Sequence, residues 1–450
     1  RAKAAIDLRL AYPDEVVAWR GGRPLYRRSL LADAAELAKR LPHGEAVANY
    51  CVDRYRFMVA FVAALMSDRV TLLPSDRTAR TLIELAAIHP DICCVGDGDE
   101  APSVPSLPTV HLDCDGIAMT QVAAPPFAVD PIRVVAHVFT SGSTGRPAAN
   151  PKTWGTLVAK GHLFRDVLGM QPDEPVAMVA TVPAQHMYGF ECSILAPLMT
   201  PTAAHVGRPL LPPAVAAALA SLPAPRVLAT TPVHLRALVR AQQQLPEIAC
   251  IISATAPLGV ELAEIVERTY ATRLLEIFGC TEAGIIATRR TSREEEFTCP
   301  ADIWIRALGG THFVEAHHLP GPVPITDVIN LLSASSFRLE GRARDIVKIA
   351  GNRASLAGLN AILGGIDGVV DAVFFVPEDD PSGPTERLVA FVVAPGRSDQ
   401  DIRRELGRRI DPAFLPRRIH LVAAIPRNET GKLTREALLA LLQETTTDDT

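Results

Sequence analysis

The stretch Phe139-Thr140-Ser141-Gly142-Ser143-Thr144-Gly145-Arg146-Pro147 follows an apolar run, residues 132–138, that predicts a buried strand. Its glycines allow a tight turn that brings main-chain N–H groups close to a ligand. Its Ser and Thr hydroxyls add donors, so the loop is suited to wrapping a polyphosphate, although an ordinary Gly/Ser turn has the same composition. The loop contains neither G-x-x-x-x-G-K-[ST], the pattern of a Walker loop, nor G-x-S-x-G, the pattern of a nucleophile elbow, so both of these alternatives are excluded.

The composition is that of a large globular protein. At 450 residues the chain is too long for one small core, so we expect two or more domains. Hydrophobic residues make up 48% and charged residues 21%, and a net charge of −5 gives no reason to expect nucleic-acid binding. The eight cysteines include no C-x-x-C pair and are interpreted as reduced, mostly buried thiols. We expect a cytoplasmic protein with no membrane span, because the longest apolar run, residues 57–66, is too short to cross a bilayer.

Short apolar runs alternate with helical patterns along most of the chain. Helices are predicted at residues 29–41, 56–66, 153–168, 233–241 and 258–270, and strands at 70–73, 176–182, 226–229, 250–253 and 274–278. This alternation favours parallel α/β layers. The pattern turns to strands at 302–308, 312–317 and 323–332. The C-terminal segment alternates helix (356–363, 399–410) with strand (369–376, 388–393, 418–422), which predicts a separate α+β domain.

Five further stretches carry polar residues at defined positions. They are P-A-Q-H-M-Y-G-F-E (183–191), S-A-T-A-P (253–257), F-G-C-T-E-A-G (278–284), G-R-A-R-D-I-V-K-I-A-G-N-R (341–353) and I-P-R-N-E-T-G-K-L-T-R (425–435). Each has a plain structural alternative, such as a structural His186, a helix N-terminal carboxylate at Glu282 or a basic hairpin at 341–353. Glu191 interrupts an apolar run, and we interpret it as capping or starting a helix, or else as contacting a polar group of a substrate.

Together and in this order, the loop and these stretches resemble the motifs of the adenylate-forming superfamily, which contains acyl- and aryl-CoA synthetases, peptide-synthetase adenylation domains and luciferases. The resemblance implies that the loop binds the nucleotide phosphates through Thr140, Ser141, Gly142, Ser143, Thr144 and Gly145. Phe278 would stack on adenine, which would also pack against Ala254 and Ala256. Thr281 would donate to the α-phosphate, and Glu282 would hold Mg²⁺, a cation that prefers oxygen ligands.

The resemblance assigns the remaining site residues in the same way. The acid pocket would be lined by His186, Gly189, Gly279 and Gly284. Asp327 and Arg342 would bind the ribose, and Arg344 would be the hinge between two domains. Lys348 and Gly351 would line the approach of the thiol. The catalytic residues would be Lys432, Thr281 and His186.

The sequence departs from the superfamily pattern at two places near the motifs. Ala148 stands where relatives usually have Lys, so either Lys152 supplies that charge or the contact is missing. The acidic residue usual after the hinge is absent from Leu-Ala-Gly-Leu-Asn at 356–360. In peptide-synthetase adenylation domains, an aspartate pairs with the ammonium group of the amino-acid substrate. That aspartate has no obvious counterpart here, which favours a substrate that is not an amino acid. The motif His-Met-Tyr-Gly-Phe-Glu at 186–191 and the Asn-Pro-Lys at 150–152 most resemble those of the ligases of aryl polyene and xanthomonadin-type pathways.

These features predict a large N-terminal α/β domain, residues 1–342, with layered sheets and helices and a β-rich end. A small, mobile α+β C-terminal domain would follow at 343–450. The resemblance implies that ATP and Mg²⁺ activate an aryl or short acyl acid as acyl-AMP, with release of pyrophosphate. The acyl group would pass to a phosphopantetheine thiol of CoA or of an acyl carrier protein supplied in trans, and our first hypothesis is that the carrier protein is preferred to free CoA.

The acceptor and the activity itself leave alternatives open. The arginine pairs at 403–404, 408–409 and 417–418 predict either a basic face for an acidic carrier protein or an ordinary solvated helix face. One rival is an adenylating enzyme whose product stays bound or is passed to an acceptor other than a thiol. The other is a degenerate homologue that binds the adenylate without turnover. The missing lysine at position 148 favours the degenerate homologue, whereas Glu282 and Lys432 argue against it.

Overall fold

The computed structural model describes the chain apart from residues 1–5, 75, 99–101, 103, 117–127, 142–146, 172, 343–345, 350–351, 378–387, 428–432 and 448–450. It forms two compact units. The larger unit comprises Arg1–Trp304 and Val314–Val323, and the smaller one Ile305–Phe313 and Pro324–Thr450. The predicted domain boundary after residue 342 stays a prediction.

A six-stranded sheet forms one layer of the larger unit. Its order is β10 (Pro147–Thr153), β9 (Val134–Ser141), β5 (Val70–Leu73), β4 (Ala46–Asn49), β6 (Ile92–Gly96) and β7 (Thr109–His111). All neighbours are parallel except β10, which forms an antiparallel hairpin with β9. Helix α3 (Ala79–Ile88) covers one face, where Leu82 and Leu85 pack with Ala48 and Leu72. A short pair, β1 (Ile6–Asp7) with β8 (Ala128–Val129), stands apart from this sheet.

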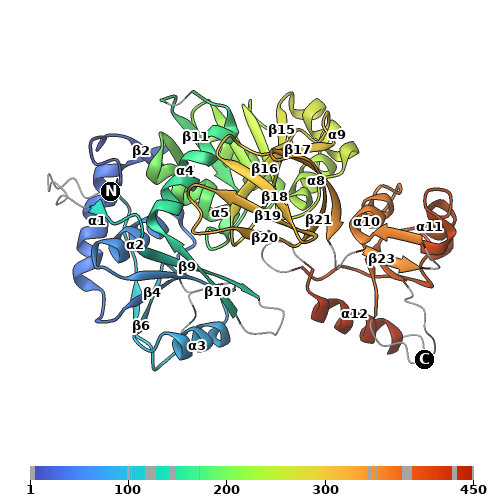
Figure 1. The fold of residues 1–450 in the computed structure, drawn as a ribbon, viewed down its shortest axis with the longest axis horizontal. Helices are drawn as coiled ribbons and strands as arrows, with labels where there is room; N and C mark the ends of the chain where they lie inside the picture. Colours follow the sequence, from blue (N-terminus) through green and yellow to red (C-terminus); the bar gives the residue numbers. More distant parts are fainter. Residues whose placement is uncertain are drawn as a thin grey trace. The chain divides into compact units, whose positions relative to one another are not determined.

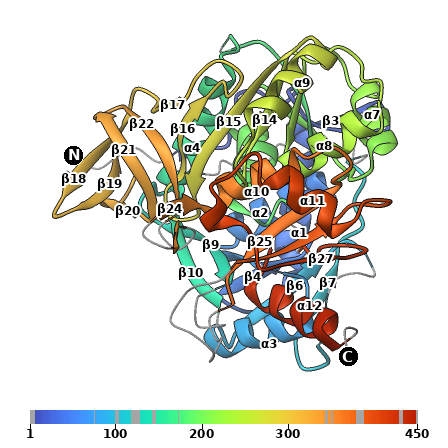
Figure 2. The same cartoon turned by 90° about the vertical axis from the view of Figure 1, so that its right-hand side faces the viewer.

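A second, larger sheet provides the parallel strands of the larger unit. Its order there is β17 (Glu296–Thr298), β16 (Gly284–Arg289), β15 (Arg273–Cys280), β14 (Cys250–Ser253), β13 (Arg226–Thr230), β11 (Val176–Ala180), β12 (Thr202–His205), β2 (Val16–Arg20) and β3 (Arg23–Tyr26). The strands from β15 to β2 are parallel, and those at either end are antiparallel. Helices α7 (Pro212–Ala220), α8 (Pro232–Arg240) and α9 (Val260–Tyr270) pack on one face (Figure 2).

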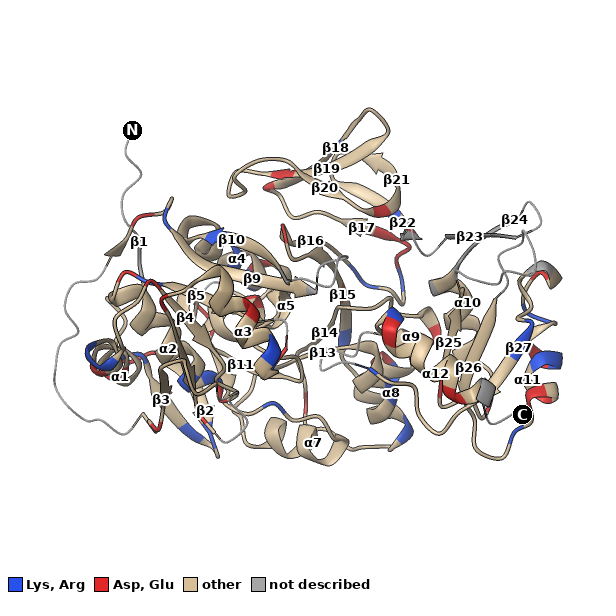
Figure 3. Ribbon diagram, turned by 90° about the horizontal axis from the view of Figure 1, so that it is seen from below, with Lys and Arg blue, Asp and Glu red and all other residues tan. Residues whose placement is uncertain are grey.

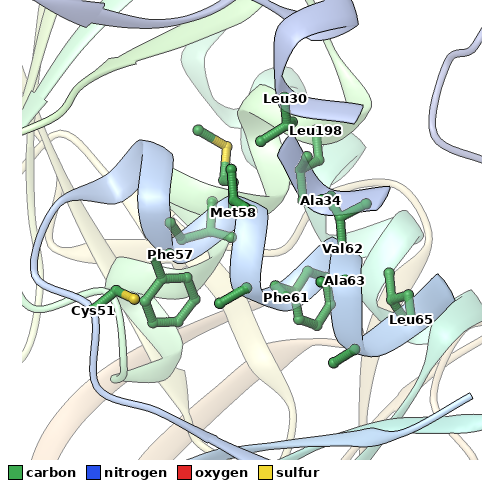
Figure 4. Packing of buried hydrophobic residues seen from close by; sticks show 14 of the residues in the cluster. Leu30, Ala34, Cys51, Phe57, Met58, Phe61, Val62, Ala63, Leu65 and Leu198 are labelled. Atoms are coloured by element: carbon green, nitrogen blue, oxygen red, sulfur yellow. The ribbon is translucent and has the colours of Figure 1, made fainter. Parts of the chain in front are cut away.

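Helix α2 (Arg54–Met66) is the centre of the main core. All its residues except Arg56 and Met66 are buried, as expected for a helix that is apolar all round. Its neighbours in this core are α1 (Arg27–Arg40), α4 (Trp154–Leu168) and a helical run made of α5 (Met187–Phe190), the π-helical segment η1 (Glu191–Leu195) and α6 (Ala196–Met199) (Figure 1). Figure 4 shows Leu30 and Ala34 of α1 near Leu198 and near Val62 of α2. The same core includes Val47 of the six-stranded sheet and Val17 of the larger sheet, so this helical layer joins the two sheets.

The smaller unit has two hairpins and a three-stranded sheet. The hairpins are β21 (Asp327–Ser333) with β22 (Ser336–Arg342), and β23 (Ile346–Ile349) with β24 (Asn352–Ser355). The sheet contains β25 (Asp371–Phe375), β26 (Val389–Val393) and β27 (Arg418–Leu421). Alternate strand residues face opposite sides. Phe374 packs with α10 (Leu356–Gly364) and α11 (Asp399–Leu406), whereas Phe375 packs with α12 (Arg435–Thr447).

The predicted fold class is confirmed, with local differences at strand ends. Strand β9 continues to Ser141 and is followed directly beyond the loop by β10, which the sequence did not predict because Pro147 and Pro151 disfavour a strand. The strand expected at 323–332 is two strands, β20 (Val323–Ile325) and β21. With β18 (Ile303–Leu308) and β19 (Thr311–Ala316), β20 forms a small sheet.

Two expectations about the chain as a whole bear on its chemistry. All eight cysteines are free, and only Cys114 and Cys280 are partly exposed, as expected for buried thiols. No helix in the described part of the chain is long and apolar enough to cross a membrane.

The buried position of α2 predicts a large stability cost for truncating Phe61. Its ring lies 5.4 Å from Phe190 and 6.5 Å from Trp154, measured between ring centroids. We expect Phe61→Ala to lower the free energy of unfolding by about 3–5 kcal/mol, because it leaves a cavity in the core. Urea unfolding followed by tryptophan fluorescence measures this change.

The matched control is Ile83→Ala on α3, because the Ile83 side chain is 54% exposed. It is expected to cost under about 0.5 kcal/mol. Equal shifts of the two variants would contradict the central role of α2.

Candidate active site

The carboxyl ends of the parallel strands bring most of the predicted residues of the larger unit to one edge of its sheet. In register, Thr230 of β13 is opposite Ser253 of β14, and Ser253 is opposite Glu276 of β15. The segments that follow these strands therefore start side by side. Ligands of open α/β sheets bind outside this edge.

The segment after β14 supplies a surface of small residues. Ala254 is buried, Ala256 is exposed, and Thr255 between them has a positive φ of 76°. Its far end is tied to β15, since the main-chain N–H of Leu258 donates to Glu276 Oε1 at 2.9 Å. Phe278 lies two residues beyond Glu276 and packs against Phe297, with ring centroids 5.7 Å apart.

Thr281 and Glu282 lie in the turn between β15 and β16. No helix begins there, so the alternative of a helix N-terminal carboxylate at Glu282 is wrong. Thr281 is half-buried and Glu282 is exposed. The turn needs both of its glycines, because an added Cβ on Gly279 would lie 2.4 Å from Gly284 O, and one on Gly284 would lie 2.2 Å from Glu191 Oε1. Gly284 also has a positive φ of 70°.

Three buried charged side chains bind the main chain of this turn. Lys152 Nζ donates to Glu282 O at 2.7 Å, and Lys160 Nζ donates to Ile285 O at 2.8 Å. Glu191 Oε1 accepts from the N–H of Ile285 at 3.2 Å. Burial lowers the pKa of Lys160 to about 8 and raises the pKa of Glu191 to about 7. The helical run begins already at Met187, so the predicted helix start at Glu191 holds only for the π-helical part.

His186 and Gly189 lie at the start of the helical run that follows β11. His186 is half-buried at the N-cap position, without a side-chain capping bond. Gly189 approaches the main chain so closely that an added Cβ would lie 1.9 Å from Pro183 O. The hydroxyl of Tyr188 donates to Ile252 O at 3.0 Å and so joins this helical run to β14.

The structure adds residues that sequence reasoning missed. Arg54 Nη2 donates to Ala180 O at 2.7 Å and to Val182 O at 2.8 Å, which fixes the chain as it leaves β11. Nearby, His234 Nδ1 lies 2.9 Å from Thr231 Oγ1 and 3.2 Å from Thr181 Oγ1. Burial lowers the pKa of His234. Position after a strand end is the one local signal that could have found Thr181 and Thr231.

The predicted ribose pair lies in the smaller unit, where Asp327 is opposite Arg342 in the β21–β22 hairpin. In the larger unit, Thr140 and Ser141 end β9. Lys348 lies in the β23–β24 hairpin, so the hairpin alternative for this stretch fits the backbone. The remaining predicted residues lie outside the described residues: Gly142, Ser143, Thr144, Gly145, Arg344, Gly351 and Lys432. The roles given to all predicted site residues stay predictions.

Two polar groups at this edge bear on whether it suits a magnesium nucleotide. Ser253 Oγ is fully buried and has no hydrogen-bond partner among the described residues. Glu282 offers an exposed carboxylate, and Mg²⁺ is commonly held by one or two carboxylates plus substrate phosphates. The described residues contain no cluster of three or more His, Cys, Asp or Glu side chains suited to a metal.

Known proteins share this sequence pattern and this fold. The family model of AMP-binding enzymes matches residues 10–302, and that of the AMP-binding enzyme C-terminal domain matches residues 359–432. The chain therefore belongs to the AMP-binding enzyme family, within the adenylate-forming superfamily. The 4-coumarate–CoA ligase of Halorhodospira halophila is 27% identical over 306 residues, which cover 65% of this chain and 73% of that protein.

Two solved structures share the fold at low sequence identity. ATP-bound MatB from Rhodopseudomonas palustris has a TM-score of 0.78 at 17% identity, covering 96% of each chain. The amide bond synthetase McbA from Marinactinospora thermotolerans has a TM-score of 0.74 at 18% identity, covering 96% of this chain and 98% of that one.

The contact at Gly284 gives a test of the turn. We expect Gly284→Ala to lower AMP affinity at least about tenfold, because the new methyl would push the turn away from Glu191 and Lys160 and store backbone strain. Calorimetric titration with AMP measures the change.

Gly309→Ala is the control for backbone strain alone. Gly309 has a positive φ of 58° but no atom within 4 Å of an added Cβ. It is expected to keep the AMP affinity of the wild type. Unchanged AMP affinity in Gly284→Ala would show that Glu191 and Lys160 do not constrain the turn.

Proposed function

We propose that this protein is an ATP-dependent carboxylic acid ligase. It activates an aryl or short acyl acid as acyl-AMP and transfers the acyl group to a phosphopantetheine thiol. The observation that carries this proposal is the convergence of small residues, an aromatic ring, a hydroxyl and a carboxylate at one sheet edge, at Ala254, Phe278, Thr281 and Glu282. The named activity of the 4-coumarate–CoA ligase relative supports an acid and a thiol as substrates.

The first step joins two anions. A carboxylate oxygen of the acid attacks the α-phosphorus of ATP, the bond to the bridging oxygen breaks, and pyrophosphate leaves. The protein must therefore position the acid and ATP and neutralise their negative charges. Thr281 would donate to the α-phosphate, and Lys432 would lie between the carboxylate and phosphate oxygens. A Mg²⁺ ion on Glu282 would neutralise phosphate charge when bound.

The second step needs no nucleophilic side chain. The sulfur of the acceptor attacks the acyl carbon, and AMP leaves with the electron pair of the broken carbon–oxygen bond. The similarity to an amide bond synthetase supports a second candidate, in which an amine replaces the thiol as acceptor.

The charges of α11 bear on the choice between CoA and a carrier protein. Arg404 pairs with Asp401, and Arg409 with Glu405. Arg403 donates to the carbonyl oxygen of Pro416 at 2.8 Å. Acidic residues (Asp399, Asp401) lie in the first turn of this helix and basic residues (Arg403, Arg404) in its last turn, and both signs of charge are visible on it in Figure 3. This pairing favours a solvated helix face over a basic docking face, so we expect CoA to serve at least as well as a carrier.

Carboxylate-dependent exchange of labelled pyrophosphate into ATP tests the first step. We expect exchange with at least one acid from a panel of aryl and short acyl acids. Binding of an acyl-adenylate without exchange for any acid would instead identify the degenerate homologue. With the acid found, CoA, holo-carrier protein and a primary amine are then compared as acceptors.

Lys432 gives the sharpest test of the first step. We expect Lys432→Ala to lower pyrophosphate exchange by about 10²–10³-fold, because a preorganised cation lost from the transition state costs about that much. ATP affinity should change far less, and thioester formation from supplied acyl-adenylate should survive. Exchange within about threefold of wild type would instead fit a surface lysine, whose removal leaves stability within about 0.5 kcal/mol.

A further inference from the structure

Three charged side chains of the larger unit lie beneath the turn between β15 and β16. Lys152 is the last residue but one of β10, Lys160 lies in α4, and Glu191 is the first residue of η1. They are 4%, 1% and 1% exposed. The sequence predicts that either Lys152 supplies the charge missing at Ala148 or that contact is absent, and the structure places the Lys152 side chain in the interior.

Each of the three side chains forms a hydrogen bond with a main-chain atom. Lys152 Nζ holds Glu282 O, while Lys160 Nζ and Glu191 Oε1 hold the C=O and the N–H of Ile285. The buried side chains therefore fix the main chain on both sides of Ala283 from the protein interior. Gly284 allows this approach, because any Cβ there would overlap the Glu191 carboxylate.

Stability alone does not explain two buried ammonium groups and one carboxylate. Removing such charges from water costs several kcal/mol per ion, and apolar side chains of similar volume often stabilise a core as well or better. The shifted pKa values of Lys160 and Glu191 reflect this cost of burial. What apolar side chains cannot do is hold a carbonyl oxygen in one direction.

We propose that Lys152, Lys160 and Glu191 are positioning residues that fix the main chain of residues 282–285 and so aim the Glu282 carboxylate at the nucleotide's metal ion. Lys152 has the most direct effect, because it holds the carbonyl group of Glu282 itself toward the interior, while the side chain of the same residue is exposed. This inference rests on the proposed function for the role of Glu282.

The test compares ATP binding with and without Mg²⁺ by calorimetry, so it needs no turnover. In wild type, Mg²⁺ is expected to strengthen ATP binding. Lys152→Met keeps an unbranched side chain, one atom shorter than that of Lys, and removes its charge. We expect it to reduce that Mg²⁺-dependent gain by about tenfold, the usual effect of losing a group that orients a metal ligand. Metal-free ATP affinity should change by less than about threefold.

The matched control is Lys39→Met, since the Lys39 side chain on α1 is 72% exposed. It should leave both ATP affinities unchanged. A folded Lys152→Met protein whose Mg²⁺-dependent gain falls by less than about threefold would overturn the proposal and leave Lys152 a purely structural residue.

A second variant covers the case in which Lys152→Met does not fold. Lys152→Gln keeps a polar side chain that is one atom shorter, so its N–H is expected not to reach Glu282 O, and the same threshold for the Mg²⁺-dependent gain decides its outcome. The ligase function and the positioning role of Lys152 can also be rejected independently of each other. Absence of pyrophosphate exchange with normal Mg²⁺-dependent ATP binding in wild type would reject the ligase function, while the comparison of Lys152 variants would still decide the positioning role.

Discussion

The parallel pairing of β13, β14 and β15 is the constraint on which the site depends. It places Thr230, Ser253 and Glu276 in one row, so the segments that follow them leave the sheet at the same edge. Residues far apart in the chain are thereby brought together. The bond from the Leu258 N–H to Glu276 then holds the segment after β14 against β15. A shift of register would separate the small residues that follow β14 from the aromatic ring of β15.

Close main-chain contacts set the shape of this edge. At Gly189, Gly279 and Gly284 a methyl group would lie within 2.4 Å of an oxygen atom, so each glycine is required by packing. The same approach lets Glu191 and Lys160 reach the main chain of β16. A glycine within a motif thus reports that two backbones, or a backbone and a buried charge, meet at that position.

The core of the larger unit supports the edge from behind. Helix α2 is buried on all sides, and its first residue, Arg54, carries a charge into that interior. The cost of burying this guanidinium is offset by carbonyl acceptors, two of them on the chain as it leaves β11. Burial also lowers the pKa of Arg54 to about 10. Arg54 therefore joins the apolar core directly to the segment that leads to His186.

The sequence by itself determined the superfamily, the α/β class and the order of most elements, because apolar periodicity and motif spacing are local properties that survive without partners. Strand β14 and helix α4 show this; α4 begins one residue after its predicted start, with Thr153 as its N-cap. Only the tertiary structure decided what Lys152, Lys160 and Glu191 do, since their acceptors and donors lie about a hundred residues away. It also decided that residues 147–153 form a strand despite two prolines, because pairing with β9 outweighs local preference. The direction of a buried charge depends on distant backbone atoms, and no local pattern records them.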